Sequence, residues 1–215
     1  MIVGMWMTRN LVCVQPDTPL REAASLMRDN RIRRLPVVAR KGDELSLLGI
    51  VSATDIYRAY PAHCNPFAAD SEAQAPATTA GEVMSTSVLT TTPDTPLEDA
   101  ATIMRDRKIG ALPVMRQGRL LGLITESDIF RAFISLLKAD AGAVRVTFSV
   151  ASDEDLFALL ADAVKGSQLQ VLSMMASSRD GQSMCVARIA GQGVEKFIDG
   201  LWKSGHQVVN VLPAG

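Results

Sequence analysis

The pentapeptide PDTPL occurs twice in the chain, at Pro16–Leu20 and again at Pro93–Leu97. The similarity extends well beyond these five residues: residues 7–38 align with residues 84–115 without a gap, and residues 47–60 align with residues 120–133. The two copies differ in length only within a stretch of turn residues, where insertions cost little. The chain therefore contains a duplicated unit.

Each copy predicts the order strand, helix, strand, strand, helix. Thr18 and Thr95 are good N-cap residues, and the proline after each suits the first position of a helix. LPVV (35–38) and LPVM (112–115) are typical of short strands. One copy alone would bury little surface, so we expect the two copies to pack face to face, with grooves between them.

A different pattern follows the two copies. We place the first repeat at residues 1–60, a linker rich in Ala, Pro, Ser and Thr at residues 61–80, and the second repeat at residues 81–138. Residues 143–215 predict the element order βαββαβ, which is the ferredoxin-like arrangement. The predicted fold class is therefore α/β of the α+β kind, with a repeat pair and a separate C-terminal domain.

The composition is typical of a soluble globular protein, with 47% hydrophobic residues and a formal net charge of −1. This charge argues against a dedicated nucleic-acid binder, and no apolar run reaches the ~18 residues that cross a bilayer. Cys13, Cys64 and Cys185 are odd in number and far apart, so we expect reduced thiols and a cytoplasmic protein. His63 and His206 lie near no nucleophile or metal-ligand cluster in the sequence, so we expect neither an enzyme nor a metal site.

The stretches GIVSATD (Gly49–Asp55) and GLITESD (Gly122–Asp128) carry the strongest functional signal. Each places two hydroxyls and an aspartate at a strand-to-helix turn. Unpaired N–H groups there favour an anion, and the carboxylate can accept hydrogen bonds from ribose hydroxyls. The same spacing is also an ordinary helix-capping pattern. Its occurrence in both copies favours the ligand-binding interpretation.

The run RDNRIRRLP (28–36) is basic, and two interpretations of it remain open. Its cations can complement the dipole at a solvated helix end, or Arg33 or Arg34 can reach a bound phosphate. A nucleic-acid patch is disfavoured because no aromatic residues are interleaved with the arginines.

The motifs P-x-x-P-L-x-x-A, h-x-x-L-P-V-h and the Gly-to-Asp turn follow one another twice, and with them residues 3–138 resemble a tandem pair of CBS domains, or Bateman module. The resemblance implies a regulatory homodimer without catalysis. It would sense AMP, ADP, ATP or S-adenosylmethionine in clefts between the repeats. Position by position, the resemblance assigns Val12, Ile32, Arg33, Arg34, Ser52, Thr54 and Asp55 to a first cleft, and Leu89, Ile109, Gly110, Thr125, Ser127 and Asp128 to a second.

The two expected clefts differ where Arg33 and Arg34 of the first copy correspond to Gly110 and Ala111 of the second. A guanidinium offers phosphate a planar fork of donors that glycine and alanine lack. We therefore expect the first cleft to prefer polyphosphates and to lose affinity steeply with added salt. The second cleft should discriminate weakly among AMP, ADP and neutral adenosine, and its affinity should change little with salt.

Residues 143–215 resemble an ACT-type domain, and a CBS pair followed by such a domain is the layout of the acetoin-utilisation regulatory family. The resemblance implies a link to acetoin or energy metabolism. The stretch ASDEDLF (151–157) lacks the glycine that amino-acid-binding ACT domains carry after their first strand, so we expect this domain to serve oligomerisation. The rival hypothesis for the whole chain is an oligomerisation module whose clefts are vestigial.

Overall fold

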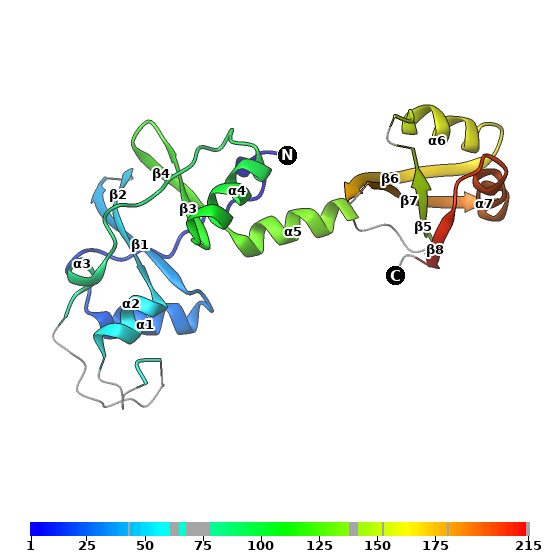
Figure 1. Ribbon diagram of the computed structural model, residues 1–215. Helices are drawn as coiled ribbons and strands as arrows, with labels where there is room; N and C mark the ends of the chain where they lie inside the picture. Colours follow the sequence, from blue (N-terminus) through cyan, green and yellow to red (C-terminus); the bar gives the residue numbers. More distant parts are fainter. Residues whose placement is uncertain are drawn as a thin grey trace. The chain divides into compact units, whose positions relative to one another are not determined.

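The computed structural model describes residues 1–42, 44–60, 65–67, 78–137, 142–151, 153–179 and 181–213 (Figure 1). These residues form two compact units, Met1–Ala132 and Phe133–Gly215. Most of the linker expected at residues 61–80, including His63 and Cys64, lies outside the described residues.

The N-terminal unit is built from the two sequence repeats, and both have the same fold. Each consists of a helix, an antiparallel pair of strands and a second helix. The elements of the first repeat are α1 (Leu20–Asp29), β1 (Arg34–Lys41), β2 (Glu44–Ser52) and α2 (Ala53–Ala59). Those of the second repeat are α4 (Leu97–Arg107), β3 (Ala111–Arg116), β4 (Arg119–Thr125) and α5 (Glu126–Leu137), of which residues 133–137 belong to the C-terminal unit.

The strand expected at the start of each copy does not form. It is reduced to one parallel bridge, between Val14 and Val37 in the first repeat and between Thr91 and Val114 in the second. A proline follows two residues later in each copy. Because proline has no N–H to donate to a ladder, pairing cannot continue through it.

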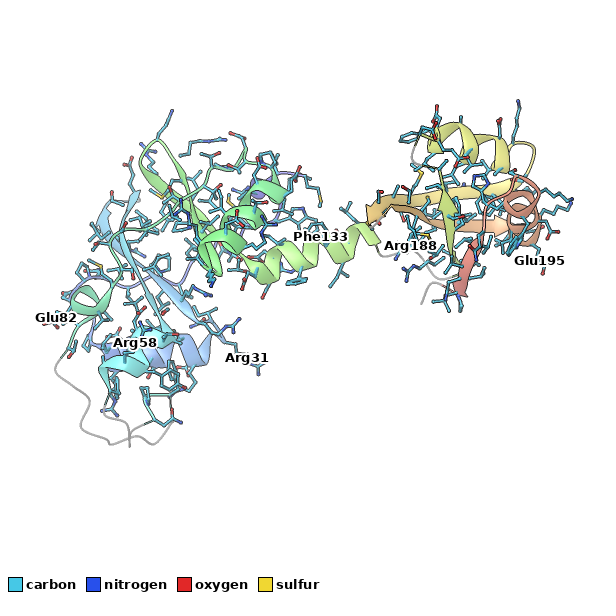
Figure 2. All side chains as sticks on the ribbon, viewed as in Figure 1. Arg31, Arg58, Glu82, Phe133, Arg188 and Glu195 are labelled. Atoms are coloured by element: carbon cyan, nitrogen blue, oxygen red, sulfur yellow. The ribbon has the colours of Figure 1, made fainter. Side chains whose placement is uncertain are left out.

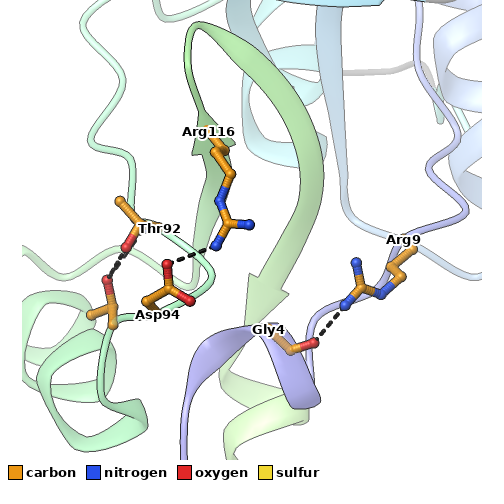
Figure 3. Close-up of polar contacts among 6 residues, drawn as sticks. Gly4, Arg9, Thr92, Asp94 and Arg116 are labelled. Atoms are coloured by element: carbon orange, nitrogen blue, oxygen red, sulfur yellow. Dashed lines mark hydrogen bonds and ion pairs between the residues drawn. The ribbon is translucent and has the colours of Figure 1, made fainter.

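The helices after PDT begin at Leu20 and Leu97, with the preceding proline at the N-cap position. The threonine therefore stands one residue further from the helix than expected. Instead of capping, the hydroxyls of Thr18 and Thr95 each accept a hydrogen bond from the backbone N–H three residues earlier. Figure 3 shows the second of these turns, with the hydroxyls of Thr92 and Thr95 3.0 Å apart.

The segment at the start of the chain completes the second repeat. It contains the 3-10 helix η1 (Val3–Met5). The N–H groups of Val3 and Gly4 donate to the carbonyls of Thr95 and Pro93 at 2.9 and 2.7 Å. The carbonyl of Gly4 in turn accepts from Arg9 at 2.8 Å (Figure 3).

The segment between the repeats completes the first repeat in the same way. It contains the short helix α3 (Ala80–Val83). The N–H groups of Ala80 and Gly81 donate to the carbonyls of Thr18 and Pro16, both at 2.8 Å. We call residues 3–8 and 78–85 the lead-in segments of the first and second repeat. Each repeat therefore depends on the lead-in segment of the other, which ties the two into one unit.

The apolar core of each repeat also contains residues from the lead-in segment of the other repeat. The first core combines buried residues of α1, β1, β2 and α2 with Ala80, and the second combines residues of α4, β3, β4 and α5 with Val3 and Met7. The lead-in residues thus gain the stability of burial only in the packed pair.

The C-terminal unit contains the expected βαββαβ order: β5 (Val144–Val150), α6 (Leu156–Val164), β6 (Gln168–Arg179), β7 (Gln182–Gln192), α7 (Val194–Lys203) and β8 (Val208–Pro213). The strands form one antiparallel sheet in the order β6-β7-β5-β8. Alternate residues of β5 and β7 pack with both helices in one core around Phe148, Leu160 and Phe197. No described helix of either unit is long and apolar enough to cross a membrane.

Candidate functional site

The motif turn of the first repeat joins β2 to α2 and is closed by hydrogen bonds. Oδ2 of Asp55 accepts from the N–H and the hydroxyl of Ser52 at 2.8 and 2.6 Å. The N–H of Asp55 donates back to Ser52 Oγ at 3.3 Å. This is a capping box, so the capping interpretation of the motif is confirmed.

The motif turn of the second repeat joins β4 to α5 with the same bonds. Oδ2 of Asp128 accepts from the N–H and the hydroxyl of Thr125 at 2.9 and 2.7 Å. Oδ1 of Asp128 accepts from Nη2 of Arg131 at 2.7 Å. Asp128 is only 2% exposed, so its charge is satisfied almost entirely by the protein.

The two aspartates differ in their second oxygen. Among the bonds between described residues, none reaches Oδ1 of Asp55, the atom that corresponds to the Arg131-bound oxygen of Asp128. Capping and ligand binding are therefore compatible in the first repeat, because one carboxylate oxygen can hold the helix while the other accepts from a ligand.

The glycine that opens each motif has a structural role. A Cβ on Gly49 would lie 2.8 Å from the carbonyl oxygen of Ser85, and one on Gly122 would lie 2.7 Å from that of Thr8. Ser85 and Thr8 belong to the exchanged lead-in segments, which form paired backbone bonds with the neighbouring residue of β2 or β4. Glycine is needed here because another backbone approaches closely.

A cleft of about 810 Å³ lies beside the first motif turn, in the size range of small-molecule sites. Basic, hydroxyl and apolar side chains all line it. The cations are Arg33, Arg34, Arg58, Arg107 and Lys108, the carboxylates are Asp55 and Glu126, the hydroxyls include Ser52, Thr54 and Ser87, and the apolar residues include Ile50, Val88, Leu89 and Ile109. We call this the larger cleft.

A second cleft, of about 330 Å³, lies beside the motif turn of the second repeat. We call it the smaller cleft. Its lining also combines cations, hydroxyls and apolar side chains, which include Arg31, Arg33, Arg34, Arg131, Thr125, Ser127, Asp128, Leu11, Val12 and Ile32.

The structure groups the candidate residues differently from the expectation. Ser52, Thr54 and Asp55 share the larger cleft with Leu89, Ile109 and Gly110, whereas Thr125, Ser127 and Asp128 share the smaller cleft with Val12 and Ile32. The repeats pack with β2 against β4, so the motif turn of one repeat meets the segment before the LP strand of the other. Sequence alignment of the copies cannot reveal this crossing, because it is a property of their packing.

Arg33 and Arg34 line both clefts. The expected difference in salt dependence assumed that they belong to one cleft, so it does not follow from the structure. Arg34 is partly buried, and this burial is the main cause of the lowered pKa of its guanidinium. The positive charge of Arg33 lowers the pKa further, whereas the negative charge of Glu126 raises it.

Several lining residues were missed by the sequence reasoning. Arg58 and Arg131 follow the motif aspartate by three residues in each copy, so they lie one helical turn away on the same face. That equivalent spacing was a detectable signal. Arg58 projects from α2 and Arg31 lies just before β1 (Figure 2).

Comparison with known proteins agrees with this architecture. The family model described as CBS domain matches residues 3–62 and 80–135, which are the two structural repeats. The chain belongs to the CBS-domain family.

Three solved structures resemble the CBS pair of this chain. A putative acetoin utilization protein (AcuB) from Vibrio cholerae is 34% identical, with a TM-score of 0.53 over 64% of this chain and 93% of that one. The CBS domain pair of protein MJ0100, in complex with 5′-methylthioadenosine and S-adenosyl-L-methionine, is 26% identical, with a TM-score of 0.52 over 63% and 97%. CBSX2 in complex with AMP is 26% identical, with a TM-score of 0.51 over 64% and 98%.

Curated relatives share the same region in proteins of very different length. The match spans 94% of a CBS domain-containing protein from Dictyostelium discoideum, but only 22% of a homoserine O-acetyltransferase from Methanosalsum zhilinae. The similarity is therefore to the CBS pair and does not extend to a whole enzyme.

Proposed function

We propose that this CBS-domain protein is a regulatory sensor that binds a phosphate-bearing adenine nucleotide in the clefts of its repeat pair. The main observation in its support is that residues of both repeats meet in each cleft, which we call a crossed cleft. It brings the two hydroxyls and the aspartate of one repeat's motif opposite apolar and basic residues of the other. The adenosine ligands of MJ0100 and CBSX2 support the choice of adenosine compounds.

In the larger cleft, each part of a nucleotide has a suitable partner. Oδ1 of Asp55 is placed to accept from a ribose hydroxyl, since the described bonds use only Oδ2. The apolar side chains of Leu89 and Ile109 can pack against the base, and Lys108 and Arg58 can bind phosphate oxygens. In the smaller cleft, Asp128, Val12 and Ile32 take the corresponding roles.

The charge of the clefts favours phosphate over a sulfonium ligand. Five cations line the larger cleft against two carboxylates. S-adenosylmethionine carries a positive sulfonium, which such a lining repels, whereas AMP, ADP and ATP bring negative charge that it attracts. We therefore rank the adenine nucleotides above S-adenosylmethionine for this chain.

The proposed mode of action is a change in the packing of a homodimer. A ligand with different affinity for two arrangements of the repeats shifts the population between them. Exposed apolar residues on α5, among them Phe130, Phe133 and Ile134, support self-association. Figure 2 labels Phe133 on this helix. Light scattering at micromolar concentration should give at least twice the 23.1 kDa mass of one chain, and the mass of a single chain would refute self-association.

We propose an ACT-like role in oligomerisation for the C-terminal unit, supported by its βαββαβ order and its two edge strands, β6 and β8. The likeness to the Vibrio protein supports a link to acetoin or energy metabolism, and the free thiols of Cys13 and Cys185 support a reducing, cytoplasmic location. No metal-binding group of three or more His, Cys, Asp or Glu occurs among the described residues, and we propose no catalysis.

Calorimetric titration of the whole chain with AMP, ADP, ATP, adenosine and S-adenosylmethionine tests the proposal. We expect binding of the nucleotides, and thermal stabilisation worth about 2.7 kcal/mol when a ligand is present at 100 times its dissociation constant. No response to any adenosine compound would refute nucleotide sensing and favour the oligomerisation module.

A further inference from the structure

Arg34 stands at the wall between the two clefts. Together with Glu126 and Gly110 it lines both of them. Arg34 opens β1 in the first repeat, and Glu126 opens α5 in the second. The two repeats therefore each contribute a charged side chain to the boundary between the clefts.

The place of Arg34 is fixed by Gly110. A Cβ at position 110 would lie 2.6 Å from Nη2 of Arg34 and 2.8 Å from Oε2 of Glu126. The guanidinium and the carboxylate thus occupy the space that any other side chain at position 110 would fill. In the first copy the corresponding residue is Arg33, so this arrangement exists once in the molecule and not twice.

The guanidinium of Arg34 is suited to bind one further anion. It is partly buried, and burial, together with the repulsion from Arg33, lowers its pKa despite the attraction of Glu126. A phosphate beside it would therefore be more favourable than beside a fully hydrated cation. The planar donor fork of arginine binds one oxyanion at a time in bidentate geometry.

We propose that Arg34 is an anion-binding residue shared by the two clefts, so that a phosphate-bearing nucleotide in one cleft lowers the affinity of the other. The proposal rests on the proposed function, because it requires that the clefts bind nucleotides. Two phosphate groups at one guanidinium would repel each other, and Glu126 already neutralises part of its charge. By linkage, each nucleotide weakens the other by the same factor.

The test compares each cleft alone with the same cleft when its neighbour is filled. Asp128→Ala leaves the larger cleft as the working site and Asp55→Ala leaves the smaller one, so titration of these variants with ADP gives two intrinsic dissociation constants. In the unaltered chain the second ADP should bind at least about fivefold more weakly than the corresponding intrinsic constant. With neutral adenosine as probe, the unaltered chain should bind at both clefts independently.

Arg34→Gln should make the two ADP sites independent. The control is Arg58→Gln, which removes a cation from the larger cleft only. It should lower the ADP affinity of that cleft and leave the coupling between the clefts in place. Independent ADP binding in the unaltered chain, stronger binding of the second ADP, or coupling that persists in Arg34→Gln would each overturn the shared role of Arg34 and leave the proposed function standing. Failure of ADP and adenosine to bind at all would overturn both. Where an alanine variant does not fold, Asp55→Asn or Asp128→Asn supplies the intrinsic constant in its place, because the side-chain oxygen of asparagine still accepts the capping hydrogen bonds while the charge is removed.

Discussion

The guanidinium of Arg131 donates to Oδ1 of Asp128 at 2.7 Å, whereas the bonds described for Asp55 involve only its Oδ2. A ribose hydroxyl that enters the smaller cleft must therefore compete with Arg131. Because Arg131 is 64% exposed, the pair is worth at most about 1 kcal/mol. In an Asp55→Ala background we expect Arg131→Gln to tighten adenosine binding by up to about fivefold, measured by calorimetry.

The matched control is Arg58→Gln in an Asp128→Ala background. Arg58 has the equivalent position, but no described bond joins it to Asp55, so adenosine affinity of the larger cleft should not rise. Unchanged adenosine affinity in Arg131→Gln would mean that Arg131 does not compete with the ligand.

The motif aspartates should have a double effect when they are removed. Asp55→Ala and Asp128→Ala each delete a capping-box acceptor, so each should lower the free energy of unfolding by about 0.5–2 kcal/mol. Each should also weaken nucleotide binding at its own cleft by about 1.5–3 kcal/mol, the value of a hydrogen bond to a charged group. Urea denaturation measures the first effect and calorimetry the second.

The variant Glu82→Ala serves as a control that separates the loss of stability from the loss of nucleotide affinity. Oε2 of Glu82 accepts from the N–H of Thr79 at 2.7 Å in the capping box of α3, and Glu82 lines neither of the two clefts. Glu82→Ala should reduce stability and leave nucleotide affinity unchanged. If Asp55→Ala and Asp128→Ala behave like Glu82→Ala, the motif is a helix cap without a role in binding.

Much of this architecture could be predicted from local sequence. The duplicated motifs predicted two like repeats and the strand-to-helix turns of Ser52–Asp55 and Thr125–Asp128, because these depend on residues close in the chain. The periodicity after residue 143 likewise predicted the helices and strands of the C-terminal unit. The start of α1 was misplaced by one residue, because Thr18 bonds backward to Gln15 instead of forward into the helix.

Contacts between distant segments could not be predicted in this way. The exchange of the lead-in segments through Val3 and Ala80, and the crossed clefts, depend on how one repeat packs on the other. A single sequence aligns position 33 with position 110 but does not show that Arg34 would lie over Gly110. That contact is the feature that divides the clefts.

The thiol of Cys185 should make the C-terminal unit sensitive to alkaline pH. Cys185 lies on β7, and its side chain is fully buried in the core that the sheet forms with α6 and α7. This burial raises the pKa of the thiol to about 11. In the unfolded chain a thiol releases its proton at pH ~8.5. Between these values the folded state holds one more proton, so the free energy of unfolding should fall by about 1.4 kcal/mol for each pH unit.

Denaturation at pH 8 and pH 10 measures this loss. In Cys185→Ala the extra proton is absent, so the unfolding free energy should decline less between the two pH values, although the small cavity lowers it at both. Cys13→Ala should keep the full decline of the C-terminal unit. Equal declines in the unaltered chain and in Cys185→Ala would show that the thiol does not titrate as expected.

The motif glycines should be among the least replaceable residues of the N-terminal unit. A methyl group at Gly49 or Gly122 would press on a lead-in carbonyl at 2.8 or 2.7 Å, and on the sulfur of Met84 or Met7. Backbone held by paired hydrogen bonds cannot move aside easily, so Gly49→Ala and Gly122→Ala should each destabilise this unit by about 1–3 kcal/mol. By contrast Gly200, inside α7, has nothing within 4 Å of its added Cβ, and Gly200→Ala should stabilise the C-terminal unit by about 0.5–1 kcal/mol. Urea denaturation of the three variants decides the matter: a tolerated alanine at both Gly49 and Gly122 would mean that the lead-in segments are not held against β2 and β4.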